Sequence, residues 1–372
     1  MQEEEEDKRT IVVHLESYWI TTGFSGDDSP IAVFPAVVGR PKDPQDQRVF
    51  VGDEALAKRR ILNLSYPIQH GIITNWDDLQ AILDHLFKNE LRVNCEEFNV
   101  LATDCVLNPK ANREKLTQVM FERFNVPNFY IAKDAMLVLF ASGRTTGSVI
   151  MVHSGSTFTV SLYEGYCLPH AVLRSDIGGV DHEEYLRKLL GERSYTFSTP
   201  REKEIVSDIY KKHAYIALDY DAELVKARSG SEIELNYEMP DGQIITIGKE
   251  RFQAPEMMLK PDLYGATEDG IHKQIYQTIM KCDQNISRDL YSNIILSGRY
   301  SMTSGLPERL NEEIRKLAPD PNFVKVIAPP EREYGVWIGG AIVSSLSTFQ
   351  TMWITKSEYN ESGPGIVHRK CF

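Results

Sequence analysis

The residues best placed to do chemistry lie in two similar segments that begin 138 residues apart, at Thr10 and Ser148. Each segment reads as an apolar strand, a short polar turn and a second strand of alternating character. Such a turn binds phosphate when its residues are small enough for backbone N–H groups to approach the oxygens. It also needs a cation to offset charge and a carboxylate to hold a metal's water shell. The spacing is too long for a solenoid and indicates two related halves.

Local signals predict helices between the strands of each half. The segment 75–87 starts with an N-cap asparagine and two acids, and it continues with a helical apolar stripe. Pro109 is predicted at the first position of a second helix. Thr199 is predicted to cap a third helix that starts at Pro200. The alternation of strands and helices favours an α/β fold.

Length and composition predict a globular protein of about two domains, because 42% of the 372 residues are apolar and 25% are charged. Lys and Arg number 41 against 53 Asp and Glu, so the net charge of −12 disfavours nucleic acid and anionic membranes as partners. No apolar stretch approaches the length of a membrane span, and residues 1–7 are acidic, unlike a signal peptide. The five cysteines are scattered, which predicts reduced thiols.

Long stretches of the sequence resemble actin, in order and along essentially the whole chain. The matching segments are Gly23–Pro30, Val38–Lys42, Val51–Ala55, Tyr66–Asp77, Leu107–Lys115, Ala141–Gly147, Tyr163–Tyr166, Ile327–Arg332, Val336–Gly340 and Ile366–Phe372. The resemblance implies the actin-like fold that is shared with Hsp70 and the sugar kinases. It predicts a first lobe of residues 1–141 plus 335–372, a second lobe of residues 142–334, and a central cleft. In that family the two hairpins hold the phosphates of ATP and its Mg²⁺.

The first hairpin departs from the family pattern Asp-Asn-Gly-Ser-Gly-x-x-Lys. The residues at these eight positions are His14, Leu15, Glu16, Ser17, Tyr18, Trp19, Ile20 and Thr21. The acid, both glycines and the lysine are replaced, and only the serine remains. Glu16 would repel phosphate and Tyr18 would obstruct backbone approach.

The second hairpin departs as well from its family pattern, Asp-Ser-Gly-Asp-Gly-Val-Thr-His. Aligned without gaps, its residues are Met151, Val152, His153, Ser154, Gly155, Ser156, Thr157 and Phe158. Both acids are lost, and Phe158 replaces the histidine associated with water activation. Asp134 stands where the family has a water-positioning glutamine. The nucleoside side of the cleft differs from the family as well. Arg299 stands where the family has a glycine, Glu333 where it has a lysine, and Tyr210 and Lys211 where it has a Lys-Glu pair. The other expected cleft positions are Gly179, Gly298, Met302 and Tyr334.

These departures predict degenerate or absent Mg-ATP binding, no catalytic residues and no resident metal. Losing about four charge-assisted hydrogen bonds at roughly 1.5–3 kcal/mol each removes on the order of 6–12 kcal/mol of binding free energy. The alternative is a remodelled pocket that still holds ATP or ADP with Mg²⁺. We also consider that protein groups such as His14 and Arg299, facing Asp134 and Glu16, close the cleft. Zinc held by His14, His153 and a carboxylate is a further alternative.

A groove between the lobes, which takes hydrophobic helices and neighbouring subunits in actins, keeps its small or apolar character. Its predicted residues are Phe140, Ala141, Gly143, Thr145, Gly165, Ile338, Ile342, Val343, Leu346, Thr348 and Met352. The alternative is that these residues are core positions of the lobe junction. The loop 43–50 is shorter than in actins, and it lacks the apolar tip that inserts into the next subunit. One retained groove and one blunted end favour a cap or a fixed subunit over a dynamic polymer.

The sequence therefore predicts an actin-like structural protein of the cytoskeleton and cytoplasm, a pseudo-ATPase. Its expected partners are actin, actin-like subunits and cytoskeletal proteins. One alternative is an ATP-hydrolysing, filament-forming actin. A second alternative is a nuclear actin-like scaffold of a chromatin complex.

Overall fold

The computed structural model describes residues 9–43 and 45–371, so the acidic residues 1–7 lie outside the described part. The chain divides into two compact units. Unit 1 comprises residues 1–145, 162–167 and 334–372, and unit 2 comprises residues 146–161 and 168–333. These bounds differ from the predicted lobes at 142–145, 162–167 and 334. Gly165 N donates to Thr145 O over 2.7 Å, which ties the segment 162–167 to the loop 142–145 of unit 1.

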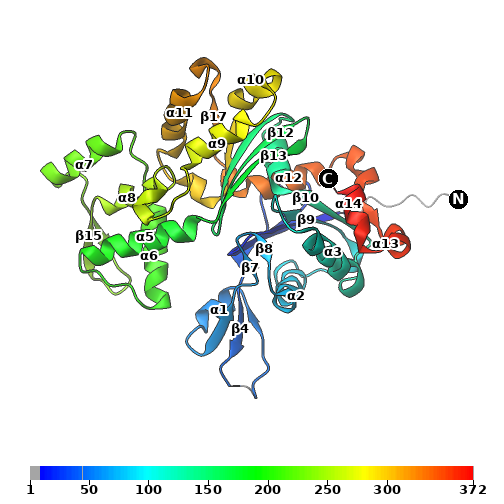
Figure 1. The fold of residues 1–372 in the computed structure, drawn as a ribbon. Coiled ribbons are helices and arrows are strands. Elements are labelled where there is room, and N and C mark those ends of the chain that lie inside the picture. The colour runs from blue at the N-terminus through cyan, green and yellow to red at the C-terminus, as the bar shows by residue number, and fades with distance from the viewer. Residues whose placement is uncertain (1–8, 44, 372) are drawn as a thin grey trace. The chain divides into compact units, whose positions relative to one another are not determined.

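The main sheet of unit 1 has six strands in the order β18-β10-β9-β1-β2-β3. Figure 1 labels β9 and β10 of this sheet. Their bounds are β1 Thr10–Leu15, β2 Trp19–Phe24, β3 Ala32–Pro35, β9 Asn99–Asp104, β10 Asn128–Lys133 and β18 Ile354–Thr355. Strands β1, β9 and β10 are parallel, whereas β1 pairs antiparallel with β2 and β2 with β3. The smaller strands are β4 Val38–Pro41, β5 Phe50–Val51 and β6 Leu62–Ser65 in one sheet, and β7 Ile68–Gln69 with β8 Ile72–Ile73 in another.

The helices of unit 1 are α1 Asp53–Ala57, α2 Trp76–His85, α3 Lys110–Gln118, α4 Asp134–Ala141, α12 Gly335–Ser344, α13 Lys356–Ser362 and α14 Val367–Lys370. The predicted N-cap of α2 is confirmed, because the Asn75 side chain accepts from Asp78 N. The helix α3 begins one residue later than predicted. Pro109 has a ψ of 137°, which is not helical, so it precedes the helix as its N-cap.

The core of unit 1 requires two helices to approach closely. Trp337 of α12 is fully buried, and its Nε1 donates to Val12 O over 3.3 Å. A Cβ on Gly339 would lie 2.0 Å from Leu137 O of α4, so glycine at this position lets α12 and α4 pack together. The glycine pair in the segment Val336–Gly340 thus serves packing.

The main sheet of unit 2 has the order β13-β12-β11-β16-β17. Its strands are β11 Gly147–Val152, β12 Thr157–Tyr163, β13 Tyr166–Ser175, β16 Ile294–Ser297 and β17 Val326–Ile327, and β14 Leu235–Glu238 pairs with β15 Ile244–Ile247. The helices are α5 Gly179–Glu192, α6 Pro200–His213, α7 Tyr220–Ser229, α8 Glu250–Glu256, α9 Ile271–Met280, α10 Gln284–Ser292 and α11 Leu306–Leu317. The predicted cap of α6 is confirmed, because Thr199 Oγ1 accepts from Glu202 N.

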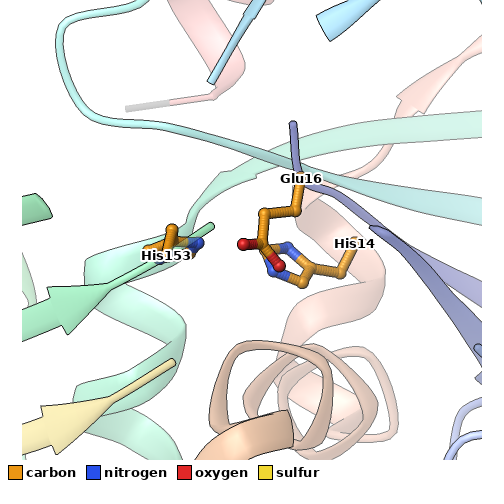
Figure 2. A group of neighbouring side chains, drawn as sticks. All are labelled: His14, Glu16 and His153. Atoms are coloured by element: carbon orange, nitrogen blue, oxygen red, sulfur yellow. The ribbon is translucent and has the colours of Figure 1, made fainter. Parts of the chain in front are cut away.

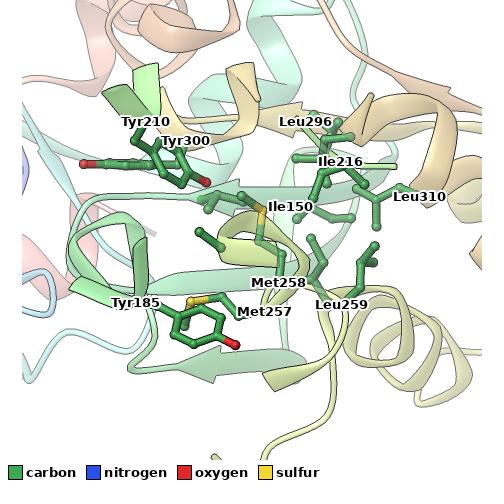
Figure 3. Packing of buried hydrophobic residues seen from close by; sticks show 14 of the residues in the cluster. Ile150, Tyr185, Tyr210, Ile216, Met257, Met258, Leu259, Leu296, Tyr300 and Leu310 are labelled. Carbon is green, nitrogen blue, oxygen red and sulfur yellow. The ribbon is translucent and has the colours of Figure 1, made fainter. Parts of the chain in front are cut away.

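An apolar cluster from β11, β16 and several helices forms the core of unit 2. Figure 3 shows Ile150 of β11 and Leu296 of β16 with Met258 and Leu310, and all four side chains are at most 3% exposed. Tyr210 and Tyr300 also belong to this cluster. Within the described part of the chain, no helix is both long and apolar enough to cross a membrane.

Candidate functional site

The first hairpin has the strand–turn–strand form that the sequence predicts. Strands β1 and β2 pair with His14 opposite Thr21, and Glu16 N donates to Trp19 O over 3.1 Å to close the turn. His14 is 8% exposed, and its Nδ1 lies 2.8 Å from Thr103 Oγ1. Imidazole therefore replaces an acid at this position and is held by a neighbouring strand of the same sheet.

Other residues of this turn also contact protein groups of unit 1. Leu15 N donates to Thr103 Oγ1, and the buried Ser17 Oγ accepts from Gly71 N over 2.8 Å. The ring of Tyr18 lies 5.2 Å from the ring of Tyr66. The one residue retained from the family pattern, Ser17, is thus engaged by backbone.

Figure 2 shows His14 and Glu16 on the first hairpin and His153 on the second. His14 and Glu16 each offer one ligand atom, and these atoms lie within 4.8 Å of each other. Zinc sites use three or four protein ligands, so these two residues of unit 1 do not by themselves make such a site.

The second hairpin closes in the same way as the first. His153 N donates to Ser156 O over 3.0 Å, just as Glu16 N donates to Trp19 O. Glu16 and His153 are both the third residue of the segments compared with the family patterns. The matched geometry supports the ungapped register, which sets His153 and Gly155 on the two glycine positions of the family pattern.

The N-terminus of α5 packs directly on this second turn. Gly179 N donates to His153 O and Val180 N donates to Ser154 O, each over 2.9 Å. A Cβ on Gly178 would lie 2.4 Å from Ser156 N, so only glycine permits this contact. Free N–H groups at a helix N-terminus attract anions. Here the first two amides of α5 are taken by carbonyls of the turn, and Ser154 and Gly155 are buried beneath them.

An aromatic ring fills space beside Gly179. A Cβ on Gly179 would lie 2.0 Å from the ring of Tyr300, which is 8% exposed. The Tyr300 ring lies 5.8 Å from the buried ring of Tyr210 on α6 (Figure 3). Tyr300 Oη donates to Glu183 Oε1 of α5 over 2.7 Å, and Ser207 of α6 donates to the same oxygen.

Sequence comparison missed Tyr300, although it directly follows the candidate Arg299. It also missed His182, whose ring stacks on Tyr210 at 6.0 Å and whose Nδ1 lies 3.3 Å from Tyr210 Oη. Burial lowers the pKa of His182 to about 3, so this imidazole is neutral. The region is a packed aromatic cluster held by hydrogen bonds.

The other nucleoside-side positions of unit 2 form an ion pair. Arg299 Nη1 lies 3.0 Å from Glu333 Oε1, with side chains 22% and 20% exposed. The preceding Gly298 has a φ of 95°, and a Cβ there would lie 2.4 Å from Val152 O. The pair joins the two positions where the family has a glycine and a lysine.

The remaining candidates on this side differ in burial. Lys211 of α6 is exposed, and Met302 is 40% exposed. Tyr334 is half-buried and belongs to unit 1.

Exchanging the charges of this pair tests its contribution. We expect Glu333→Lys to lower the free energy of unfolding by about 1 kcal/mol, because it sets a lysine beside Arg299. The double variant Arg299→Glu/Glu333→Lys is expected to recover most of that loss. Chemical denaturation of the three proteins measures it, and equal losses in the single and double variants would contradict a direct interaction.

The two positions that the resemblance links to catalysis, Asp134 and Phe158, are buried. Asp134 begins α4, is 3% exposed and accepts from Ala135 N over 2.8 Å. Burial raises the pKa of Asp134 to about 8, and the nearby Asp104 adds to the rise. This shift favours the neutral acid over the carboxylate. Phe158 and Met151 are core residues of unit 2, at 1% and 0% exposed.

The predicted groove residues all belong to unit 1, which contains an apolar cavity of about 250 Å³. Four of the eleven line it, namely Phe140, Gly165, Val343 and Met352. The other described lining residues, absent from the prediction, are Tyr130, Lys133, Met136, Glu164, Tyr166, Cys167 and Phe349. They come from β10, α4, the segment 162–167 and the short helix Ser347–Met352. The predicted groove contains no residue of β10.

The predicted groove residues outside this cavity are of two kinds. Ile342 and Leu346 are 41% and 49% exposed, and Gly143, Thr145 and Thr348 are also exposed. Ala141 and Ile338 are half-buried. The exposed members are available to a partner, whereas Val343, which lines the cavity, is only 7% exposed.

A comparison of the sequence with protein-family models matches residues 5–372 to the family described as Actin. The match spans nearly the entire chain. The mixed α/β architecture of both units agrees with the actin-like fold expected from the resemblance. This protein is a member of the actin family.

Proposed function

We propose that this protein is a pseudo-ATPase of the actin family that acts as a fixed subunit, cap or adaptor in an actin-related assembly. The observation that carries the proposal is the packing of Tyr300 on Gly179, next to the Arg299–Glu333 ion pair. These positions correspond to the nucleoside side of the family's cleft. The Tyr300 ring and the ion pair would therefore take up space that a nucleoside needs.

A nucleoside would have to displace this packing before it could bind in the manner of the family. Removing a buried aromatic side chain from a core costs about 3–5 kcal/mol, which corresponds to roughly two to four decades of affinity. The Tyr300–Glu183 hydrogen bond adds to that cost. The departures in the two phosphate hairpins weaken binding further, because Thr21 replaces the lysine and Tyr18 replaces a glycine.

The apolar cavity of unit 1 supports a role in binding other proteins. Its lining is mostly aromatic and aliphatic, and Tyr166 beside it is 62% exposed. An amphipathic helix or an apolar loop buries its anchors in such a groove. We therefore propose actin, actin-like subunits or cytoskeletal proteins as partners, and the cytoplasm and cytoskeleton as the location.

Placing a charge on the exposed rim of the groove tests the partner proposal. We expect wild-type protein to change the elongation rate of actin filaments, and Ile342→Lys to weaken this effect about tenfold or more, because a buried unpaired ammonium is costly. Met280→Lys is the matched control, since Met280 is a 50% exposed apolar residue of unit 2.

Three outcomes would contradict the proposal. Equal effects of both variants would show that the groove is not the binding surface. Pelleting of the protein alone with Mg-ATP, together with phosphate release, would instead favour the alternative of an ATP-hydrolysing filament former. Selective binding to a chromatin complex, with no effect on filaments, would favour the nuclear scaffold.

A further inference from the structure

The apolar cavity of unit 1 has a charged end. Among the lining residues that the structure describes, Lys133 is the one cation and Glu164 is the one acid. Lys133 ends β10 and directly precedes α4, whose Met136 and Phe140 continue the lining. These three residues are spaced i, i+3 and i+7, so a cation and two apolar side chains follow one another along the start of α4.

The ammonium group of Lys133 is not used inside the described part of the chain. The residue is half-buried, but its side chain forms no hydrogen bond or ion pair with any other residue that the structure describes. Its Nζ is not one of the buried polar atoms that lack a partner, so it reaches accessible space. A carboxylate that enters from another molecule can therefore pair with it.

The buried acids of unit 1 near Lys133 do not neutralise it by direct pairing. Asp104 Oδ2 lies 3.0 Å from Arg113 Nε, and Asn108 Nδ2 donates to the other oxygen of the same carboxyl. Asp134, the next residue of the chain, is 3% exposed, and burial raises the pKa of its carboxyl to about 8. That shift favours the neutral acid, which is a weak partner for an ammonium group.

The rest of the lining suits an apolar side chain. The rings of Tyr130 and Phe349 pack edge to face with their centroids 4.9 Å apart, and Met352 adds a flexible thioether. Burial raises the pKa of the Cys167 thiol to about 12, so this group is neutral. The volume of about 250 Å³ lies below the range of roughly 300–1,000 Å³ that is typical of small-molecule sites. The cavity therefore fits one anchor side chain of a protein better than a cofactor.

We propose that this cavity binds an amphipathic helix of a partner protein in which an aspartate or glutamate, one turn from the apolar anchor, pairs with Lys133. The inference rests on the proposed role of the cavity in binding other proteins, and it adds the sign and the place of the charge that the partner must carry. A carboxylate beside a half-buried ammonium group forms a charge-assisted hydrogen bond that salt screens less than an exposed one.

Fluorescence anisotropy with two synthetic peptides tests the pairing. Both peptides are amphipathic helices with blocked ends and the same phenylalanine and leucine anchors. They differ only in carrying glutamate or glutamine one turn from the phenylalanine. We expect the full-length protein to bind the glutamate peptide at least about tenfold more tightly than the glutamine peptide.

Variants of Lys133 assign this preference to its charge. Lys133→Met keeps an apolar chain of similar length and should bring the two affinities within about twofold of each other. Lys133→Arg keeps the charge and should keep the preference. Lys115→Met is the matched control, because Lys115 is an exposed lysine of α3 that bonds Gln118 and does not line the cavity. Thermal unfolding checks that Lys133→Met folds, and if it does not, the wild type and Lys133→Arg carry the test.

The outcomes separate this inference from the proposed function. Equal affinities of the wild type for the two peptides would overturn the inference, as would a preference that Lys133→Met retains or that Lys115→Met loses. If Ile342→Lys weakens both peptides equally while the wild type does not discriminate, the cavity still binds helices and only the charge pairing is wrong. If neither peptide binds, the inference is wrong, and the filament assay decides the proposed function separately. Self-association of the protein that both peptides displace equally would assign the cavity to a second copy of this chain instead.

Discussion

Substituting Gly179 by alanine is expected to lower the free energy of unfolding by about 3 kcal/mol, because overpacked cores lose roughly 1–3 kcal/mol and occasionally more. The added Cβ would lie 2.0 Å from the ring of Tyr300, so the ring or α5 must move. The ring is confined by Tyr210 and by its hydrogen bond to Glu183. Urea denaturation of the purified variant measures the change.

A double-mutant cycle assigns the effect to Tyr300. Tyr300→Ala alone is expected to cost about 3–4 kcal/mol, and in that background Gly179→Ala is expected to cost less than about 1 kcal/mol. Gly191→Ala on the same helix is the control, because a Cβ there meets nothing within 4 Å. It is expected to stabilise the helix by up to about 1 kcal/mol. Additive costs in the cycle would contradict close packing of the ring on Gly179.

Replacing Asp134 by asparagine is expected to change how stability depends on pH. Burial raises the folded-state pKa of Asp134 from 3.8 to about 8. The contribution of Asp134 to the free energy of unfolding is therefore complete below about pH 4 and is lost as the pH rises toward 8. Each pH unit within this range changes stability by about 1.4 kcal/mol. The stability difference between Asp134→Asn and wild type should therefore shift by about 3–4 kcal/mol in favour of the variant from pH 5 to pH 8.

The comparison with wild type cancels the contributions of the buried histidines. Burial lowers the pKa of His182 to about 3 and that of His272 to about 4, so both oppose the trend below about pH 6.5. Both proteins contain these histidines, so their effects cancel in the difference. Asp46→Asn is the control. A hydrogen bond from Arg48 lowers the pKa of Asp46 from 3.8 to about 2, so Asp46 is ionised throughout the range from pH 5 to pH 8. The difference in stability between Asp46→Asn and wild type should therefore not change over this range. Parallel profiles for Asp134→Asn and wild type would contradict the raised pKa.

Features set by neighbouring residues could be predicted from the sequence. The caps at Asn75 and Thr199 and the two strand–turn–strand segments depend on residues a few positions apart, and the structure has all of them. The start of α3 was missed by one residue, because proline suits both the N-cap and the first helical position, and only its ψ decides. Family membership could also be predicted, since the matching segments occur along the whole chain.

The packing of Tyr300 on Gly179 could not be predicted in the same way. A tyrosine after Arg299 carries no signal of its own, and its contact with Gly179 joins residues more than a hundred positions apart. The ion pair of Arg299 with Glu333 depends likewise on the approach of two separate segments.

We propose that protein groups take the place of the nucleotide. Acid extraction of the protein, purified in the presence of Mg-ATP, followed by anion-exchange chromatography of the extract, tests this proposal. We expect no stoichiometric adenine nucleotide in the extract. One ADP or ATP per chain would show that the proposal is wrong.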